Sequence, residues 1–238
     1  MFNGKTVSVV MPAYNEEKGV GEMVKEFKQS AYVDEVIVVD NNSNDQTAAI
    51  AERAGARVVK ELKRGYGHAC KRALLEAKGE NIVLCESDCS FSPKDLLKFL
   101  AYSDDFDLIM GTRTSRELIA KSANMYYFMK WGNWFVAKLL QVLYNGPALT
   151  DMGCTYRLIK RGALKKIKNH LYVGGSAFLA NMTTVALKKS ISTIEISVHY
   201  KGRKGISKIT GSFFKAVIVA LSMVGIIFAN LFKNYNEK

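Results

Sequence analysis

Several residue types are scarce in this 238-residue sequence, and each scarcity excludes a class of protein. Three prolines and 48% hydrophobic residues exclude a disordered chain and indicate a globular one. The three histidines, His68, His170 and His199, are far apart and form no cluster. Of the four cysteines only Cys85 and Cys89 are close together, and one pair without a nearby histidine is not a zinc motif. We therefore interpret the cysteines as small buried residues in a reducing compartment.

Acidic residues are also in the minority, with 22 against 34 lysines and arginines, which gives a formal net charge of +12. This excess favours an anionic partner: a nucleic acid, acidic lipid head groups or a phosphorylated substrate. Helix-turn-helix and zinc-finger spacings are absent from the sequence, so we expect no nucleic-acid partner. No secretory signal precedes the first strand-like segment, and we expect the catalytic part to stay in the cytoplasm.

The first half of the chain alternates between short apolar runs and segments with helical periodicity. The predicted strands are 6–11, 35–40, 56–59, 80–85 and 106–110, and the predicted helices are 16–29, 47–54, 67–77 and 92–102. Strands that are apolar on both faces, separated by helices, predict a mostly parallel sheet covered by helices, an α/β fold. Ligands of such sheets bind where the strands end, at the carboxyl edge.

The second half contains two long apolar segments. Residues 126–144 predict a helix whose few polar residues, Lys130, Asn133, Lys138 and Gln141, fall on one narrow stripe. Such a helix is either buried in the protein or lies in a membrane surface. Residues 213–232 are close to the minimum length for spanning a bilayer, and they either span it or lie at its interface. We expect a catalytic domain over 1–210 and a C-terminal membrane-associated segment over 211–238.

Polar side chains follow the predicted strands. Glu86 and Asp88 come directly after one strand, and beside a diphosphate Asp88 would hold Mg²⁺ or Mn²⁺. The alternative is a solvated acidic turn that caps the next helix. Asp40, at the end of another strand, either accepts a hydrogen bond from a nucleotide or belongs to a turn. The segment 64–67 contains two glycines but neither a Walker nor a dinucleotide-binding spacing, which disfavours kinases and dehydrogenases.

Together these segments resemble the family 2 glycosyltransferases over nearly the whole chain. The resemblance rests on 9–17 (VVMPAYNEE), 38–47 (VVDNNSNDQT), 65–69 (GYGHA) and Glu86-Ser-Asp88, where the family carries Asp-x-Asp. It implies a GT-A fold and a nucleotide-sugar site formed by Pro12, Ala13, Tyr14, Glu16, Asp40, Gly65, Gly67 and Asp88. It also implies a divalent metal, Mg²⁺ or Mn²⁺, held by Asp88, Glu86 and Ser90.

Within that family the sequence is similar to the polyprenyl-phosphate sugar synthases of the dolichol-phosphate mannose and glucose type. The similar segments are Gly111-Thr-Arg113, Lys121-Ser-Ala-Asn124, 150–157 (TDMGCTYR) and 203–208 (RKGISK). The resemblance implies inverting transfer of a sugar from a UDP- or GDP-sugar to a polyprenyl phosphate at the cytoplasmic face of a membrane. It implies an acceptor-phosphate site of Arg113, Lys121, Arg157, Arg203 and Lys208, and catalytic roles for Asp88, Asp151, Arg113 and Arg203.

The residues themselves leave alternatives open. A lipid phosphate is already a competent nucleophile, so the site chiefly needs positive charge to hold two phosphorylated substrates together. Each lysine or arginine is otherwise a solvated charge or a lipid-headgroup contact. Asp151 either acts as a base, positions the acceptor, or forms a salt bridge to Arg157. A second hypothesis is transfer to a sugar hydroxyl of a lipid-linked or cell-surface glycan, and a third is a non-catalytic nucleotide-sugar-binding protein.

Overall fold

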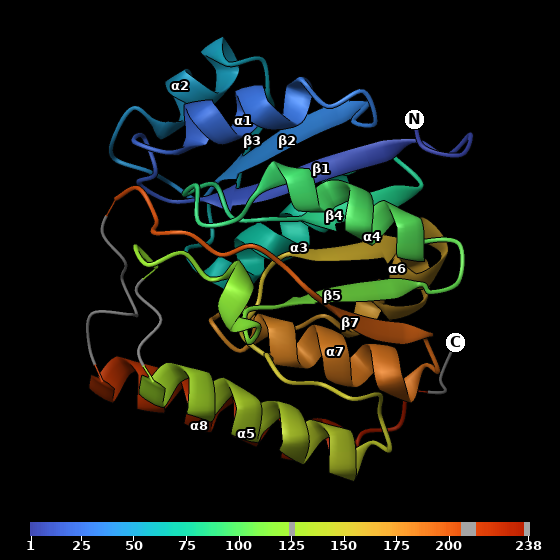
Figure 1. Ribbon diagram of the computed structural model, residues 1–238. Coiled ribbons are helices and arrows are strands. Elements are labelled where there is room, and N and C mark those ends of the chain that lie inside the picture. The colour runs from blue at the N-terminus through green and yellow to red at the C-terminus, as the bar shows by residue number, and fades with distance from the viewer. Residues whose placement is uncertain (124–126, 206–212, 236–238) are drawn as a thin grey trace.

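The computed structural model describes residues 1–123, 127–205 and 213–235 (Figure 1). A seven-stranded sheet runs in the order β3-β2-β1-β4-β6-β5-β7. Its strands are β1 (Val7–Ala13), β2 (Glu35–Asp40), β3 (Arg57–Lys60), β4 (Asn81–Leu84), β5 (Leu108–Thr112), β6 (Arg157–Lys160) and β7 (Thr193–Ser197). Strand β6 is antiparallel to β4 and β5, and the other neighbouring pairs are parallel. The predicted mostly parallel sheet is therefore confirmed, although β6 and β7 were not foreseen.

Helices cover both faces of the sheet (Figure 1). They are α1 (Val20–Lys28), α2 (Thr47–Arg53), α3 (Tyr66–Glu76), α4 (Leu96–Tyr102), α5 (Tyr127–Leu143), α6 (Arg161–Ile167), α7 (Phe178–Lys188) and α8 (Phe213–Leu231). Short 3₁₀ turns span Pro93–Asp95, Arg116–Leu118 and Lys168–His170. The helix predicted over 16–29 begins only at Val20, and the one predicted over 92–102 is a 3₁₀ turn followed by α4.

The alternation of side chains along each strand divides the core into two clusters. Val9 and Met11 of β1 face the cluster that contains residues of α1 and α4, whereas Val10 faces the cluster that contains α3, α7 and α8. Helix α1 contributes its buried stripe at Val20, Met23, Val24 and Phe27, which is the i, i+3, i+4, i+7 spacing of one helix face. The sheet thus lies between two layers of helices.

The last layer on the α3 and α7 side is made by α5 and α8, which lie side by side away from α1 and α2 (Figure 1). Met223 and Ile227 of α8 and Leu140 of α5 are buried in the same cluster as α7. Exposed apolar side chains cover the other side of both helices: Trp131, Trp134, Phe135 and Val142 on α5, and Phe214, Val217, Ile218, Leu221 and Phe228 on α8. Both predicted apolar helices are confirmed.

Candidate active site

A cavity of about 490 Å³ lies at the carboxyl ends of β1, β2, β4 and β5, where the sequence predicted ligand binding. Pro12 and Ala13 of β1 reach it directly, and the loop after β4 brings Glu86 and Asp88. Its far wall comes from α5, α7 and α8. The cavity therefore joins the strand ends to the two helices that expose apolar side chains.

Asp88 is buried and Glu86 is half-buried, and both line the cavity from the loop that follows β4. The Glu86 carboxylate accepts hydrogen bonds from the Thr155 hydroxyl at 2.7 Å and from the Tyr66 hydroxyl at 3.3 Å. Burial, and next the charge of Asp88, raise the pKa of Glu86 from 4.5 to about 7. Asp88 Oδ1 accepts from the Ser90 backbone N–H at 2.9 Å, which fixes the turn between them. Two carboxylates thus crowd one side of the cavity.

Residues 200–205 lie against the Asp88 loop. Lys201 N–H donates to the Ser90 carbonyl at 2.8 Å, and Lys204 N–H donates to the Asp88 carbonyl at 2.7 Å. The Arg203 guanidinium reaches Glu16 Oε1 at 2.5 Å and Asp88 Oδ2 at 3.4 Å. Arg203 therefore neutralises negative charge at the same carboxylate that the sequence predicts as a metal ligand.

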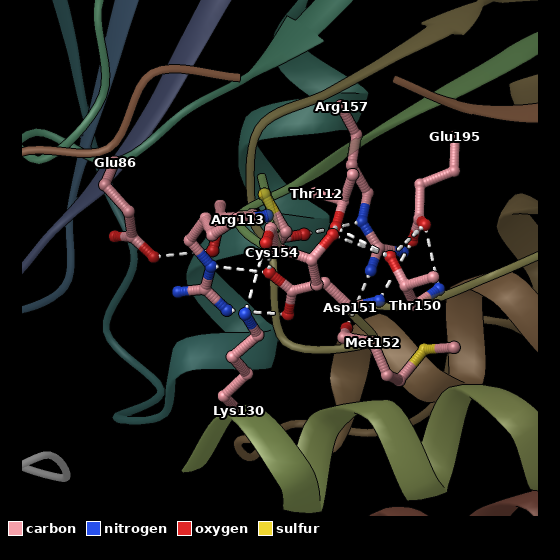
Figure 2. A network of polar contacts seen from close by, with 12 residues as sticks. Glu86, Thr112, Arg113, Lys130, Thr150, Asp151, Met152, Cys154, Arg157 and Glu195 are labelled. Atoms are coloured by element: carbon pink, nitrogen blue, oxygen red, sulfur yellow. Dashed lines mark hydrogen bonds and ion pairs between the residues drawn. The ribbon is translucent and has the colours of Figure 1, made fainter. Parts of the chain in front are cut away.

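Arg113, just after β5, is held by Asp151 (Figure 2). Its Nε and Nη2 donate to the two Asp151 oxygens at 2.7 and 2.8 Å, and its backbone N–H donates to Oδ2 at 3.0 Å. Asp151 is 0% exposed. Burial alone raises the pKa of Asp151, but the charge and hydrogen bonds of Arg113 outweigh it and lower that pKa. Asp151 is thus an ionised partner that orients Arg113.

A second carboxylate supports this pair from behind. Glu195 of β7 accepts hydrogen bonds from the Thr150 N–H at 2.8 Å, the Thr150 hydroxyl at 2.6 Å and the Asp151 N–H at 3.0 Å (Figure 2). Because Glu195 fixes the backbone at 150–151, the guanidinium of Arg113 has one orientation toward the cavity. Arg113 also packs over the Tyr200 ring at 5.1 Å.

Comparison with known proteins gives a family for this arrangement. The model of Glycosyl transferase family 2 matches residues 8–168. The chain belongs to this family. The low-salt glycan biosynthesis hexosyltransferase Agl6 of Haloferax volcanii is 31% identical over 205 residues, 84% of this chain and 49% of Agl6. The chain therefore spans about half the length of that relative.

Two further similarities extend over most of the chain. The human dolichyl-phosphate beta-glucosyltransferase is 28% identical over 84% of this chain and 69% of that protein. The crystal structure of glucosyl-3-phosphoglycerate synthase from Mycobacterium tuberculosis with Mn²⁺, UDP and phosphoglyceric acid has a TM-score of 0.74 at 18% identity, covering 97% of this chain and 80% of that one. The latter shares the fold, which agrees with the predicted GT-A class.

Ten of the residues predicted from the family resemblance line the cavity: Pro12, Ala13, Tyr14, Glu16, Gly65, Glu86, Asp88, Ser90, Arg113 and Arg203. Asp40 lies at the end of β2 without lining it, and its Oδ1 accepts from the Ser43 N–H at 3.3 Å. Lys121 is exposed outside the cavity. Lys208 lies outside the described residues.

The prediction that Arg157 binds the acceptor phosphate is wrong, because the side chain is buried and bonded within the protein. It is 1% exposed, and its guanidinium donates to the carbonyls of Met152 and Cys154 (Figure 2). The guanidinium also donates to the Leu179 carbonyl and the Thr183 hydroxyl. Since a buried guanidinium is costly without partners, these acceptors explain an arginine here. Arg157 ties the 152–154 loop to α7, and the salt bridge that was considered between Arg157 and Asp151 is made by Arg113 instead.

Gly67 also has a structural role in place of the predicted contact with the donor. Its N–H and that of His68 donate to the Gly174 carbonyl at 2.8 and 3.2 Å, so these first amides of α3 already have an acceptor. A Cβ on Gly67 would lie 2.2 Å from the Val173 carbonyl oxygen, and Gly65 has a φ of +143°. The two glycines therefore let the 173–175 loop pack closely on the start of α3.

Sequence reasoning missed several cavity residues. Asn133 of α5 lines the cavity, and the Lys130 ammonium on the same helix donates to the Thr114 carbonyl at 3.2 Å (Figure 2). Tyr66 and Thr155, the hydroxyl partners of Glu86, also line it. The polar stripe on 126–144 could have identified Asn133 and Lys130 as site residues, because polar residues on an apolar helix mark the side that faces a polar site.

The carboxylate pair fits a hard divalent cation. Within 1–123, 127–205 and 213–235 no group of three or more Asp, Glu, His or Cys side chains is positioned to hold a metal by itself. Mg²⁺ is commonly bound by one or two carboxylates together with phosphate oxygens of the substrate. Burial first, and then the charge of Asp88, raise the pKa of Glu86, and a bound cation would favour the ionised form of this carboxyl.

Proposed function

We propose that this family 2 glycosyltransferase is an inverting enzyme that transfers a sugar from a UDP- or GDP-sugar to a polyprenyl phosphate at the cytoplasmic face of a membrane. The observation that carries the proposal is one cavity that has three carboxylates and three arginines on its walls, Glu16, Glu86, Asp88, Arg64, Arg113 and Arg203, and that continues to α5 and α8. The name of the human relative, a dolichyl-phosphate beta-glucosyltransferase, supports the acceptor class.

The state of Asp151 favours a phosphate acceptor over a sugar hydroxyl. Transfer to a hydroxyl needs a general base within reach of the attacking oxygen. Asp151, the residue predicted for that role, is fully buried and has both oxygens bonded to Arg113. A phosphate oxygen is ionised already and needs only to be held in position. A glycan hydroxyl acceptor remains the second candidate, and it would require another base.

In the proposed reaction an oxygen of the acceptor phosphate attacks the anomeric carbon of the donor. The bond from that carbon to the nucleoside diphosphate breaks on the opposite side, so the configuration inverts and the diphosphate leaves with the electron pair. Arg113 and Arg203 hold the two phosphorylated substrates, whose mutual repulsion would otherwise oppose the approach. Asp88, with Glu86, would hold a divalent cation, which would supply further positive charge for the leaving diphosphate.

The proposal is tested by incubating the protein with Mg²⁺ or Mn²⁺, radiolabelled UDP- and GDP-sugars and farnesyl phosphate. A labelled product that is extractable into organic solvent and requires both the cation and the lipid phosphate is expected. Labelling of a glycan without labelling of any lipid phosphate would favour the hydroxyl acceptor.

The pKa of Glu86 predicts how cation binding depends on pH. The carboxyl titrates near pH 7 in the folded protein and near 4.5 when unfolded, so without cation the fold loses stability as the pH rises between these values. A cation needs the ionised form, and its affinity should rise about tenfold from pH 5 to pH 6 and level off above pH 7. Mn²⁺ titration followed by electron paramagnetic resonance measures this. A Glu86→Gln variant, as the control, should lack the slope over that interval.

We infer further that α8 lies in the membrane surface beside α5. By length and composition Phe214–Leu231 is able to cross a membrane, and only 17% of that window is buried. However, the buried Asn230 donates to Thr184 and accepts from Tyr172, the Lys188 ammonium donates to the Asn230 and Leu231 carbonyls, and the Tyr144 hydroxyl donates to the Ile227 carbonyl. A helix attached sideways to the domain in this way favours an in-plane position.

Charging the exposed apolar face should release the protein from membranes. Trp131 is 64% and Leu221 65% exposed, and a Trp131→Asp/Leu221→Asp variant is expected to lose at least about 100-fold in partitioning onto anionic vesicles. Co-flotation with vesicles measures the effect. Leu62, which is 79% exposed but lies on neither helix, provides the control Leu62→Asp, which should float like the parent. Full flotation of the double variant would instead favour a helix that spans the bilayer.

A further inference from the structure

The cavity has two chemically different ends. Toward β1, β2 and β4 it is lined by charged side chains, among them Glu16, Asp88 and Arg203. At the opposite end the lining includes Leu179 of α7 and two residues of α8, Val219 and Met223. A nucleoside diphosphate suits the charged end, whereas the apolar end needs a ligand with hydrocarbon next to its reacting group.

Helix α8 is apolar both toward the cavity and toward the outside. Val219 and Met223 are one turn apart and line the cavity, and Met223 is only 5% exposed. Ile218 and Leu221, on the same turns, are exposed. A hydrocarbon chain that leaves the cavity past Val219 and Met223 therefore stays in contact with apolar side chains as it reaches the outer face.

The polar groups next to the apolar end are suited to a phosphate. Arg113, which Asp151 and Glu195 hold in one orientation, lines the cavity, and Asn133 reaches it from α5. Within the part of the chain that the structure describes, the Asn133 amide makes no hydrogen bond to another residue, so it is available to a ligand. A phosphate between these groups would direct its first carbon atoms toward Leu179, Val219 and Met223.

We propose that Leu179, Val219 and Met223 form the binding site for the first, phosphate-proximal isoprene unit of the acceptor, and that this site selects branched over linear lipid phosphates. The inference rests on the proposed function, since it presupposes a lipid phosphate acceptor. Each buried methylene contributes roughly a fourfold gain in affinity, so burial of the first unit contributes strongly to binding of the acceptor, and its methyl branch contributes one such factor. The branched methyl group distinguishes an isoprene unit from a linear chain of equal length.

The test is steady-state kinetics of Met223→Trp with farnesyl phosphate and with n-dodecyl phosphate. The indole fills the apolar end, so the KM for farnesyl phosphate should rise at least about tenfold while the KM for the nucleotide sugar stays within twofold. Met223→Leu, which keeps volume and polarity, should resemble the parent. Phe228→Trp on the exposed side of the same helix controls for an added indole.

The outcomes separate this inference from the function on which it depends. If the parent glycosylates farnesyl phosphate but Met223→Trp leaves its KM unchanged, the isoprene site is wrong and the function stands. If the parent binds a nucleotide sugar yet glycosylates no lipid phosphate, the function fails as well. Photolabelling of the parent with an isoprenyl phosphate that carries a diazirine in its first unit needs no variant. Mass spectrometry should find the label on Leu179, Val219 or Met223, and labelling confined to other residues would overturn the proposal.

Discussion

Replacement of Asp88 by asparagine is expected to lower kcat/KM by at least about 10³ and to remove stimulation by Mg²⁺ or Mn²⁺. The neutral amide can still accept the hydrogen bond from the Ser90 N–H, so the turn is kept. The substitution removes the negative charge that attracts Arg203 and that, in the proposed mechanism, would bind the cation and so stabilise the leaving diphosphate. Transfer kinetics at saturating cation, and Mn²⁺ binding measured separately, check both effects.

The matched control for this variant is Asp105→Asn, an exposed aspartate between α4 and β5 whose loss should leave kcat/KM within twofold. Thermal unfolding of both variants tests whether they are folded. An Asp88→Asn enzyme that keeps more than a tenth of its activity and still responds to Mn²⁺ would mean that Asp88 is not the metal ligand.

Asp151→Asn is expected to cost stability and activity together. The substitution leaves the nearly buried Arg113 guanidinium without its counter-charge, which should lower the free energy of unfolding by about 3–5 kcal/mol. Because Arg113 then loses its fixed orientation, kcat should fall about 10²-fold. Urea denaturation and transfer kinetics measure the two quantities.

A double variant separates the two effects. Arg113→Met/Asp151→Leu removes both buried charges, so it should recover most of the stability while its activity stays low. If Asp151 were a general base, Asp151→Asn would also abolish the acidic limb of the pH–rate profile. We expect that limb to be kept, and its loss would restore Asp151 as a base.

The strand ends were predictable from local sequence. Runs such as Glu35–Asp40 and Asn81–Leu84 are apolar on both faces, which fixes them as interior strands of a parallel sheet. Polar residues that follow such strands are brought to one edge whatever the details of packing, and this is why Glu86, Asp88 and Arg113 do line one cavity. The functional roles assigned to them remain predictions.

The residues that were misjudged are those whose partners are distant in sequence. Arg157 is part of a motif similar to the family's acceptor segment, but its guanidinium also donates to the Leu179 carbonyl and the Thr183 hydroxyl, 22 and 26 positions away, which only the fold brings near. Gly67 lies in a segment that resembles a phosphate-binding loop, yet its N–H already donates to the carbonyl of Gly174. In neither case does the local sequence pattern show whether the hydrogen-bond donor is already bonded within the protein or is available to a ligand.

The amino-acid sequence by itself determined the alternation of strands and helices, the edge where the polar groups meet, and the presence of two apolar helices, since periodicity and strand hydrophobicity are local properties. Only the tertiary structure decided that Arg113 is the partner of Asp151, that the polar side of α5 carries Asn133 to the cavity, and that α8 is attached along α7. These pairings join residues 38 or more positions apart, so their geometry depends on how the layers pack and not on any stretch of sequence.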